Sequence, residues 1–223
     1  MTRSVSCGEA LISLLESYEV DTVFGIPGVH TLDLYRGLAH SNIRHVQARN
    51  EQGAGFMADG YARLGGKPGV CVLISGPGVT NACTPMGQSF ADSIPVLVIS
   101  STTASYSLGK GWGCLHEVTD LEAVTRPLTA LSATARSPDD LEELIGQAFS
   151  IFASERPRPV HIAVPIDVLA QPVSTTWQRR TVPSRPAPAG SAIREAAELL
   201  RQAERPLIYA GGGAVGTAPL LTQ

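Results

Sequence analysis

The feature that most constrains the fold is an unbroken apolar run at residues 70–74, which reads Val-Cys-Val-Leu-Ile. A strand with one face in water alternates polar and apolar residues, whereas this run has no polar position. Its length and its β-branched residues predict a strand covered on both faces, and Ser-Gly-Pro-Gly at residues 75–78 ends it. Strands of this kind are typical of parallel sheets with helices on both sides.

The rest of the chain alternates between helical spacing and short β-rich runs. The spacing predicts helices over about residues 8–17, 31–38 and 52–63, another after residue 78, and one that starts at Ser137. Further strands are predicted at residues 22–24, 43–46, 96–99 and 161–164. From Ser100 to about Thr119 the periodicity is lost, so we expect a loop over one end of the sheet. This order predicts an α/β fold with a mainly parallel sheet flanked by helices.

A proline-rich stretch at residues 171–190 has no apolar periodicity, which is typical of an interdomain linker. We therefore expect a first domain over residues 1–170, a linker over residues 171–190, and the start of a second α/β domain over residues 191–223. In that last segment the pattern predicts a helix at about residues 191–202 and a strand at residues 207–209.

Charge and composition exclude several classes of binding partner. The net charge of -3 and the absence of a Lys and Arg cluster argue against nucleic acid or an anionic membrane, so we expect a small-molecule ligand. No apolar run approaches the roughly 20 residues that span a bilayer, and the first residues do not resemble a signal peptide, so we expect a cytoplasmic protein. The four cysteines form no CxxC pair, and neither they nor the histidines have zinc-site spacing, so no metal site is expected.

Glu51 is the first candidate functional residue. It lies between the predicted strand at residues 43–46 and the predicted helix at residues 52–63, and a series of small residues follows it. By itself, a glutamate in the first turn of a helix is most often a residue that suits the helix dipole. Two glycine turns, Gly-Ile-Pro-Gly at residues 25–28 and the one at residues 75–78, also follow predicted strands, and either alone would be only a tight turn.

Together, these three segments resemble the pyrimidine-binding domain of the thiamine-diphosphate-dependent acetolactate synthase and 2-oxo acid decarboxylase family. The match at residues 49–63 is a Glu followed by a small-residue helix that ends in Tyr-Ala-Arg. Residues 125–127 and 158–168 resemble the family's end-of-domain sequence, so the resemblance covers almost the whole chain. It implies an enzyme that decarboxylates 2-oxo acids or joins them as acetolactate synthases do.

The resemblance also implies residue roles. Glu51 would be catalytic, because the family's Glu hydrogen-bonds N1′ of the aminopyrimidine and so prepares the cofactor to lose its C2 proton. The cofactor-binding candidates are Pro27, Gly28, Glu51, Gly76, Pro77, Gly78 and Asn81.

His30 and His116 are substrate candidates, because they depart from the acetolactate synthase pattern. His30 stands where that pattern has a small or apolar residue, and Leu-His-Glu at residues 115–117 stands where it has Phe-Gln-Glu. A lone histidine in a glycine-rich turn is most often solvated or structural, whereas two near the cofactor can bind a polar oxo acid or relay protons. The turn that contains His30 and the loop that contains His116 resemble those of decarboxylases of the 5-guanidino-2-oxopentanoate type more than those of acetolactate synthases.

Part of the family's machinery is not found in these 223 residues. The family binds Mg²⁺ through a Gly-Asp-Gly motif in a separate C-terminal domain, and no such motif occurs here. We therefore expect a truncated part of a longer homodimeric or homotetrameric enzyme, inactive by itself. The alternative is a non-catalytic binding or regulatory module of the same fold that works through a partner chain.

Residues 211–216, Gly-Gly-Gly-Ala-Val-Gly, satisfy the dinucleotide pattern G-x-G-x-x-G. The acidic residue expected about 20 positions later is not found, so a nicotinamide site is only a second hypothesis. The resemblance instead implies the opening of a central domain, which holds FAD in acetolactate synthases, so FAD is a possible cofactor.

Overall fold

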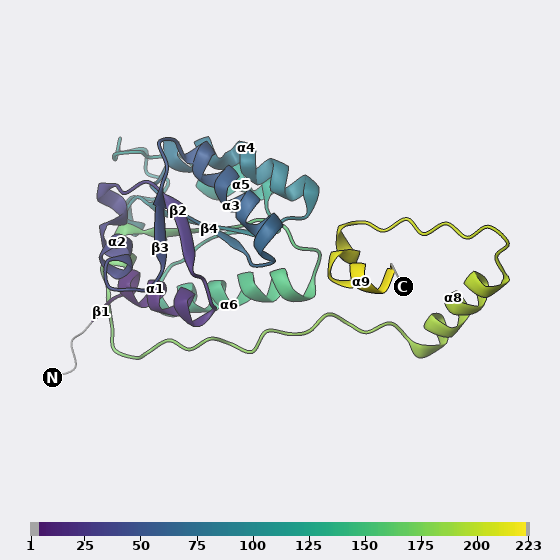
Figure 1. Ribbon diagram of the computed structural model, residues 1–223. Coiled ribbons are helices and arrows are strands. Elements are labelled where there is room, and N and C mark those ends of the chain that lie inside the picture. The colour runs from purple at the N-terminus through teal and green to yellow at the C-terminus, as the bar shows by residue number, and fades with distance from the viewer. Residues whose placement is uncertain (1–4, 222–223) are drawn as a thin grey trace. The chain divides into compact units, whose positions relative to one another are not determined.

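The computed structural model describes residues 5–221, and those up to Arg185 include a parallel sheet between two layers of helices (Figure 1). The six strands of the sheet, in spatial order, are β3 (Arg44–Gln47), β2 (Thr22–Gly25), β4 (Gly69–Leu73), β5 (Val96–Thr102), β7 (Val160–Pro165) and β6 (Leu131–Thr134). Every neighbouring pair is parallel. β4 is buried along its whole length, which confirms the strand predicted from the apolar run.

The helices cover both faces of this sheet. They are α1 (Cys7–Ser17), α2 (Leu32–Leu38), α3 (Glu51–Gly65), α4 (Pro77–Asp92), α5 (Leu121–Thr125), α6 (Pro138–Ser154) and α7 (Ile166–Leu169). α3, α4 and α5 lie on one side of the sheet, and α1, α2 and α6 lie on the other (Figure 1). The first three contribute to one apolar cluster and the other three to a second. The α/β class with a mainly parallel, helix-flanked sheet is therefore confirmed.

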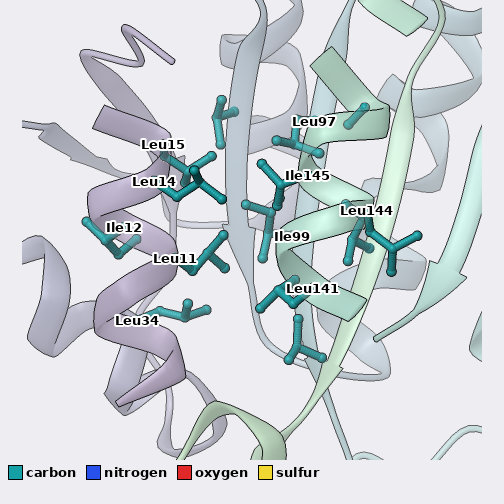
Figure 2. Close-up of a cluster of buried hydrophobic side chains, with 14 of the residues drawn as sticks. Leu11, Ile12, Leu14, Leu15, Leu34, Leu97, Ile99, Leu141, Leu144 and Ile145 are labelled. Carbon is teal, nitrogen blue, oxygen red and sulfur yellow. The ribbon is translucent and has the colours of Figure 1, made fainter. Parts of the chain in front are cut away.

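Aliphatic side chains fill the larger of the two clusters. Figure 2 shows Leu11 and Leu15 of α1 directed toward Ile99 of β5 and Ile145 of α6. None of these four side chains is measurably exposed. At about 25 cal/mol per Å² of buried apolar surface, such residues supply most of the free energy that holds the helices on the sheet.

One prediction about the chain after β4 is wrong, and one strand there was not predicted. The loop expected from Ser100 starts later, because β5 continues to Thr102 and its last three residues pair with β7. Hydroxyl side chains broke the apolar pattern there, yet Ser100 and Ser101 are buried, with hydroxyl groups that form hydrogen bonds. β6 was not predicted: its residues, Leu-Ser-Ala-Thr, alternate apolar and polar over only four positions, and all four are half-buried.

The chain divides into two units, the first ending at Arg185 and the second beginning at Pro186. The first part of the segment assigned to a linker is packed on the first unit. There β8 (Pro172–Val173) pairs with β1 (Val5–Ser6) in an antiparallel two-stranded sheet, and Trp177 is buried. Only the later part of that segment lies in the second unit.

The second unit contains α8 (Gly190–Gln202), a 3-10 helix η4 (Gly212–Thr217) and α9 (Ala218–Leu221). The strand predicted at residues 207–209 is not formed, because a strand needs a neighbour for its backbone groups and no described residue pairs with this segment. The strand–turn–helix context required by the dinucleotide pattern is therefore missing among the described residues.

None of the helices within residues 5–221 is both long enough and apolar enough to cross a membrane.

Candidate functional site

The candidate residues lie at the carboxyl ends of β2, β3 and β4, where the topology opens a crevice. The chain leaves β2 toward the face of α2, whose Leu34 and Leu38 belong to one apolar cluster. It leaves β4 toward the opposite face, where Val79 and Ala82 of α4 belong to the other. In open α/β sheets, ligands bind where the connections of adjacent strands diverge in this way.

Glu51 is the first residue of α3, directly after β3 and its connecting turn. The helix starts there because the Asn50 side chain accepts a hydrogen bond from the Gln52 backbone N–H at 2.9 Å. The Asn81 amide on α4 donates to Oε2 of Glu51 at 2.9 Å. Among the described residues, no group donates to Oε1, so one carboxyl oxygen is oriented by the protein and the other is available to a ligand.

The two glycine turns pack against each other beside Glu51. A Cβ atom on Gly28 would lie 2.5 Å from Cδ1 of Ile74, and one on Gly78 would lie 2.8 Å from Cγ2 of the same side chain. Gly78 also faces Glu51, since its added Cβ would be 3.8 Å from the Glu51 Cγ. A larger residue at either position would collide with Ile74, so glycine is required for this close packing.

His30 and His116 lie together, although 85 residues separate them in the sequence. Their ring centroids are 6.0 Å apart in an edge-to-face arrangement. His30 Nδ1 lies 2.8 Å from the Ser75 hydroxyl, and the Ser75 backbone N–H donates to the Ser101 hydroxyl at 3.1 Å. Partial burial, and to a lesser degree the neighbouring His116, lower the pKa of His30, so its ring is mainly neutral at pH 7.

His116 has two unusual features. Its backbone is in the left-handed region, with a φ of 58°. Its Nδ1 is buried and has no hydrogen-bond partner among the described residues. Unsatisfied buried nitrogens are rare in proteins, so this one is a candidate contact for a bound molecule.

A cavity of about 700 Å³ opens beside the second glycine turn. Pro77, Thr80 and His116 line it together with the loop from Gly109 to Thr119. Glu117 holds this loop in shape, since its two carboxylate oxygens accept hydrogen bonds from the backbone N–H groups of Gly111 at 3.0 Å and Cys114 at 2.9 Å. A cavity of this size suits a small-molecule ligand.

The structure brings most of the predicted site residues together. Glu51 contacts Asn81, Gly28 and Gly78 share a neighbour, and the oxygen of His116 closes over Gly76. Pro77 lines the cavity, whereas Pro27 is an exposed residue of the first turn.

Sequence reasoning missed the hydroxyls of Ser75 and Ser101. Ser75 was inside the glycine turn and could have been found as a polar group beside two glycines. Ser101 had no such signal, because its position was assigned to a loop.

No group of three or more His, Cys, Asp or Glu residues within the described part of the chain is placed to hold a metal ion.

Comparisons with known proteins found a matching family and several relatives. Residues 5–124 match the family described as "Thiamine pyrophosphate enzyme, N-terminal TPP binding domain". The chain is 60% identical over 221 residues to a probable 2-ketoarginine decarboxylase of Pseudomonas aeruginosa, covering 98% of the chain and 40% of that protein. It is 39% identical over 218 residues to an acetolactate synthase of Mycobacterium bovis, covering 96% of the chain and 35% of that protein.

An Escherichia coli relative, the large subunit of acetolactate synthase isozyme 1, is 38% identical over 210 residues. That alignment covers 93% of the chain and 37% of the relative. The chain therefore spans 35 to 40% of the length of these three relatives.

Proposed function

Because this chain belongs to the thiamine pyrophosphate enzymes through its N-terminal TPP-binding domain, we propose that it forms the cofactor-activating half of a 2-oxo acid decarboxylase. The single observation that carries the proposal is the position of Glu51, whose carboxyl group is held by Asn81 at the crevice with one oxygen left over. Acetolactate-type carboligation uses the same cofactor and is the alternative reaction.

The residues at the crevice fit an aminopyrimidine ring. Gly28 and Gly78 lie directly against the side chain of Ile74, which is a half-buried apolar surface between the two turns. Oε1 of Glu51 and Nδ1 of His116 have no protein partner among the described residues. A planar heterocycle with ring nitrogens and an amino group offers what such a site lacks: a face to stack and groups to hydrogen-bond.

Thiamine diphosphate, when bound, supplies the electron sink that decarboxylation of a 2-oxo acid requires. In our proposal, Glu51 holds and exchanges a proton at Oε1 with a ring nitrogen, while Asn81 keeps Oε2 fixed. The glycine turns bring backbone groups to the ring. His30, which is mainly neutral at pH 7, can accept a proton, and the Ser75 hydroxyl at Nδ1 orients its ring.

For the substrate, we propose a 2-oxo acid with a polar side chain, of the 5-guanidino-2-oxopentanoate type. Support comes from the 60% identical relative, which is named a probable 2-ketoarginine decarboxylase, and from His116, which lines the cavity and pairs with His30. Pyruvate is the substrate to compare, because joining two pyruvates is the carboligation alternative.

The described residues do not provide a site for Mg²⁺ or for FAD. They contain no cluster of metal ligands, no residue of α8 is buried, and an added Cβ on the glycines at residues 211–213 would meet nothing within 4 Å. We therefore propose that Mg²⁺ binds through residues outside this chain. These contacts give no support for FAD binding. The roles proposed for Glu51 and His30 depend neither on Mg²⁺ nor on FAD.

We also propose that the protein works as a homodimer or homotetramer. Large apolar side chains are exposed close to the candidate residues in sequence: Val29, Leu32, Phe56, Trp112 and Leu115. Exposed apolar patches of this kind are typical of interaction sites. Sedimentation velocity is expected to show a dimer or larger for the product of the full reading frame, and a monomer at all concentrations would contradict the proposal.

Replacing Glu51 by Gln is the main test of the catalytic proposal. The amide keeps the size of the side chain but cannot exchange a proton, so we expect decarboxylation to fall by about 10²- to 10⁴-fold. Binding of thiamine diphosphate with Mg²⁺, measured by calorimetry, is expected to remain. The measurement uses the product of the full reading frame, with 5-guanidino-2-oxopentanoate and pyruvate as substrates.

Glu143→Gln is the matched control, because Glu143 is an exposed carboxylate on α6, far along the chain from the crevice. It should retain full activity. Unchanged turnover in the Glu51 variant would reject the catalytic role of Glu51. A wild-type protein that neither binds the cofactor nor decarboxylates would favour a non-catalytic module instead.

A further inference from the structure

The sheet has a second crevice at its carboxyl edge, over β5, β7 and β6. The chain leaves β5 toward the α4 face, where Leu121 of α5 packs. It leaves β7, the neighbour of β5 in the sheet, toward the opposite face, where Val168 and Leu169 of α7 pack. The connections therefore diverge here as they do beside β2 and β4, and a diverging pair is where an α/β sheet opens to a ligand.

A cavity of about 390 Å³ fills this crevice. Thr102, Thr134 and Pro165, the last residues of the three strands, line one side of it. Within the described chain, the hydroxyls of Thr102 and Thr134 have no hydrogen-bond partner. The volume lies in the range of about 300–1,000 Å³ that is usual for small-molecule sites.

Three charged side chains line the same cavity, and they are poorly matched to one another. Arg136 donates its backbone N–H to Asp140 at 2.8 Å, but its guanidinium has neither an ion pair nor a hydrogen bond with any described residue. Glu122 has only a long contact, at 3.9 Å, with the mostly exposed Arg126. Asp120 uses one oxygen to cap α5, through the Ala123 N–H at 2.9 Å.

We propose that this crevice binds a small zwitterion, with its carboxylate on Arg136 and its cationic end, an ammonium or guanidinium group, on Glu122 and Asp120. A simple anion would find two carboxylates in the cavity, and a simple cation would find the guanidinium. A molecule with both charges satisfies all three groups, and the threonine hydroxyls can complete its hydrogen bonds.

This site is next to the cavity of the candidate active site. Gly109, Val118 and Thr119 line both cavities, and His116 is two residues from Val118. An occupant of the second crevice thus contacts the loop that carries His116, which gives it a physical route to alter the first site.

Calorimetry on the 223-residue chain, without thiamine diphosphate, tests the proposal independently of the proposed function. The probes are 5-aminopentanoate, which has both charges, and pentanoate and pentylammonium, which have one each. We expect 5-aminopentanoate to bind at millimolar concentration or below, and each single-charge probe to bind at least about tenfold more weakly. Absence of binding, or equal binding of pentanoate, would overturn the proposal.

Variants then assign the charges. Arg136→Gln and Glu122→Gln are each expected to weaken 5-aminopentanoate binding by about tenfold. Arg44→Gln is the control, because Arg44 is an exposed arginine on β3, at the opposite edge of the sheet from β6, and it should bind like the parent. Unchanged affinity in the Arg136 variant would place the ligand elsewhere and reject the site.

Discussion

His161 is a completely buried histidine that takes no part in the proposed chemistry. It lies in β7, where Nε2 is 2.9 Å from the Ser100 hydroxyl and Nδ1 is 2.8 Å from the Thr125 hydroxyl. Burial disfavours the charged ring and lowers its pKa to about 4. The imidazole therefore acts as a neutral link between β5, β7 and α5.

This burial predicts a loss of stability in mild acid. The unfolded chain takes up a proton at a pKa of about 6.5, whereas folded His161 does so only near 4, so the unfolded state binds more protons between these values. The free energy of unfolding should fall as pH decreases across this window, by an amount on the order of 3 kcal/mol. Urea unfolding at several pH values measures it.

The lowered pKa values of His30 and His45 act in the same direction, so a variant is needed to isolate His161. His161→Gln should be less stable at pH 7 but lose less stability on acidification. His40→Gln, at an exposed histidine, should keep the pH dependence of the parent. A pH dependence that is equally steep in the His161 variant would contradict this account.

At the scale of elements, the turn between β4 and α4 depends on the backbone of Gly76. Its φ of 55° and ψ of -110° are unfavourable for any residue with a Cβ. An added Cβ would also overlap the backbone oxygen of His116. This one glycine therefore joins the second turn to the loop that carries His116.

Gly76→Ala is expected to lower the free energy of unfolding by about 1–2 kcal/mol or more, because Ala destabilises where φ is positive. It should also displace His116 and reduce turnover. Chemical denaturation measures the first effect. Gly60→Ala is the matched control, since Gly60 lies inside α3 and an added Cβ would meet nothing within 4 Å. That change should stabilise the protein by up to about 1 kcal/mol, and equal effects at the two positions would contradict the backbone argument.

At the scale of the whole molecule, the two units differ in how much they bury. The first unit has two apolar clusters around its sheet, whereas no residue of α8 in the second is buried. The first unit also includes the segment around Trp177, whose side chain is 6% exposed, and the Arg180 backbone N–H donates to the Tyr18 hydroxyl at 3.0 Å. Its stability should therefore depend on this segment and not on α8.

Two truncations test that expectation. A chain ending at Arg185 should unfold at the same temperature as the full chain. A chain ending at Ala170 loses the β1–β8 pair and the burial of Trp177, which should lower the free energy of unfolding by about 3–5 kcal/mol. Differential scanning calorimetry compares them, and equal melting temperatures for the two truncated chains would show that residues 171–185 are a linker after all.

The sequence by itself determined the α/β class and most of the sheet. Local patterns predicted β4 from its apolar run, and α1, α3 and α6 from their helical spacing. Burial of one or both faces of an element produces such a pattern in the sequence. β6 and the β1–β8 pair were not predicted, because the alternation in β6 covers only four residues and the paired strands β1 and β8 have only two residues each.

The candidate site divides in the same way. Its glycine turns and Glu51 were found from the sequence. Close approach of two backbone segments requires glycine, and the start of a helix favours residues such as Glu51, so both leave a local signal. Only the tertiary structure decided that Asn81 holds Glu51, that His30 meets Ser75 and His116, and that Arg136 lines a second crevice. These contacts join residues far apart in the chain, and the packing of helices on the sheet sets their distances.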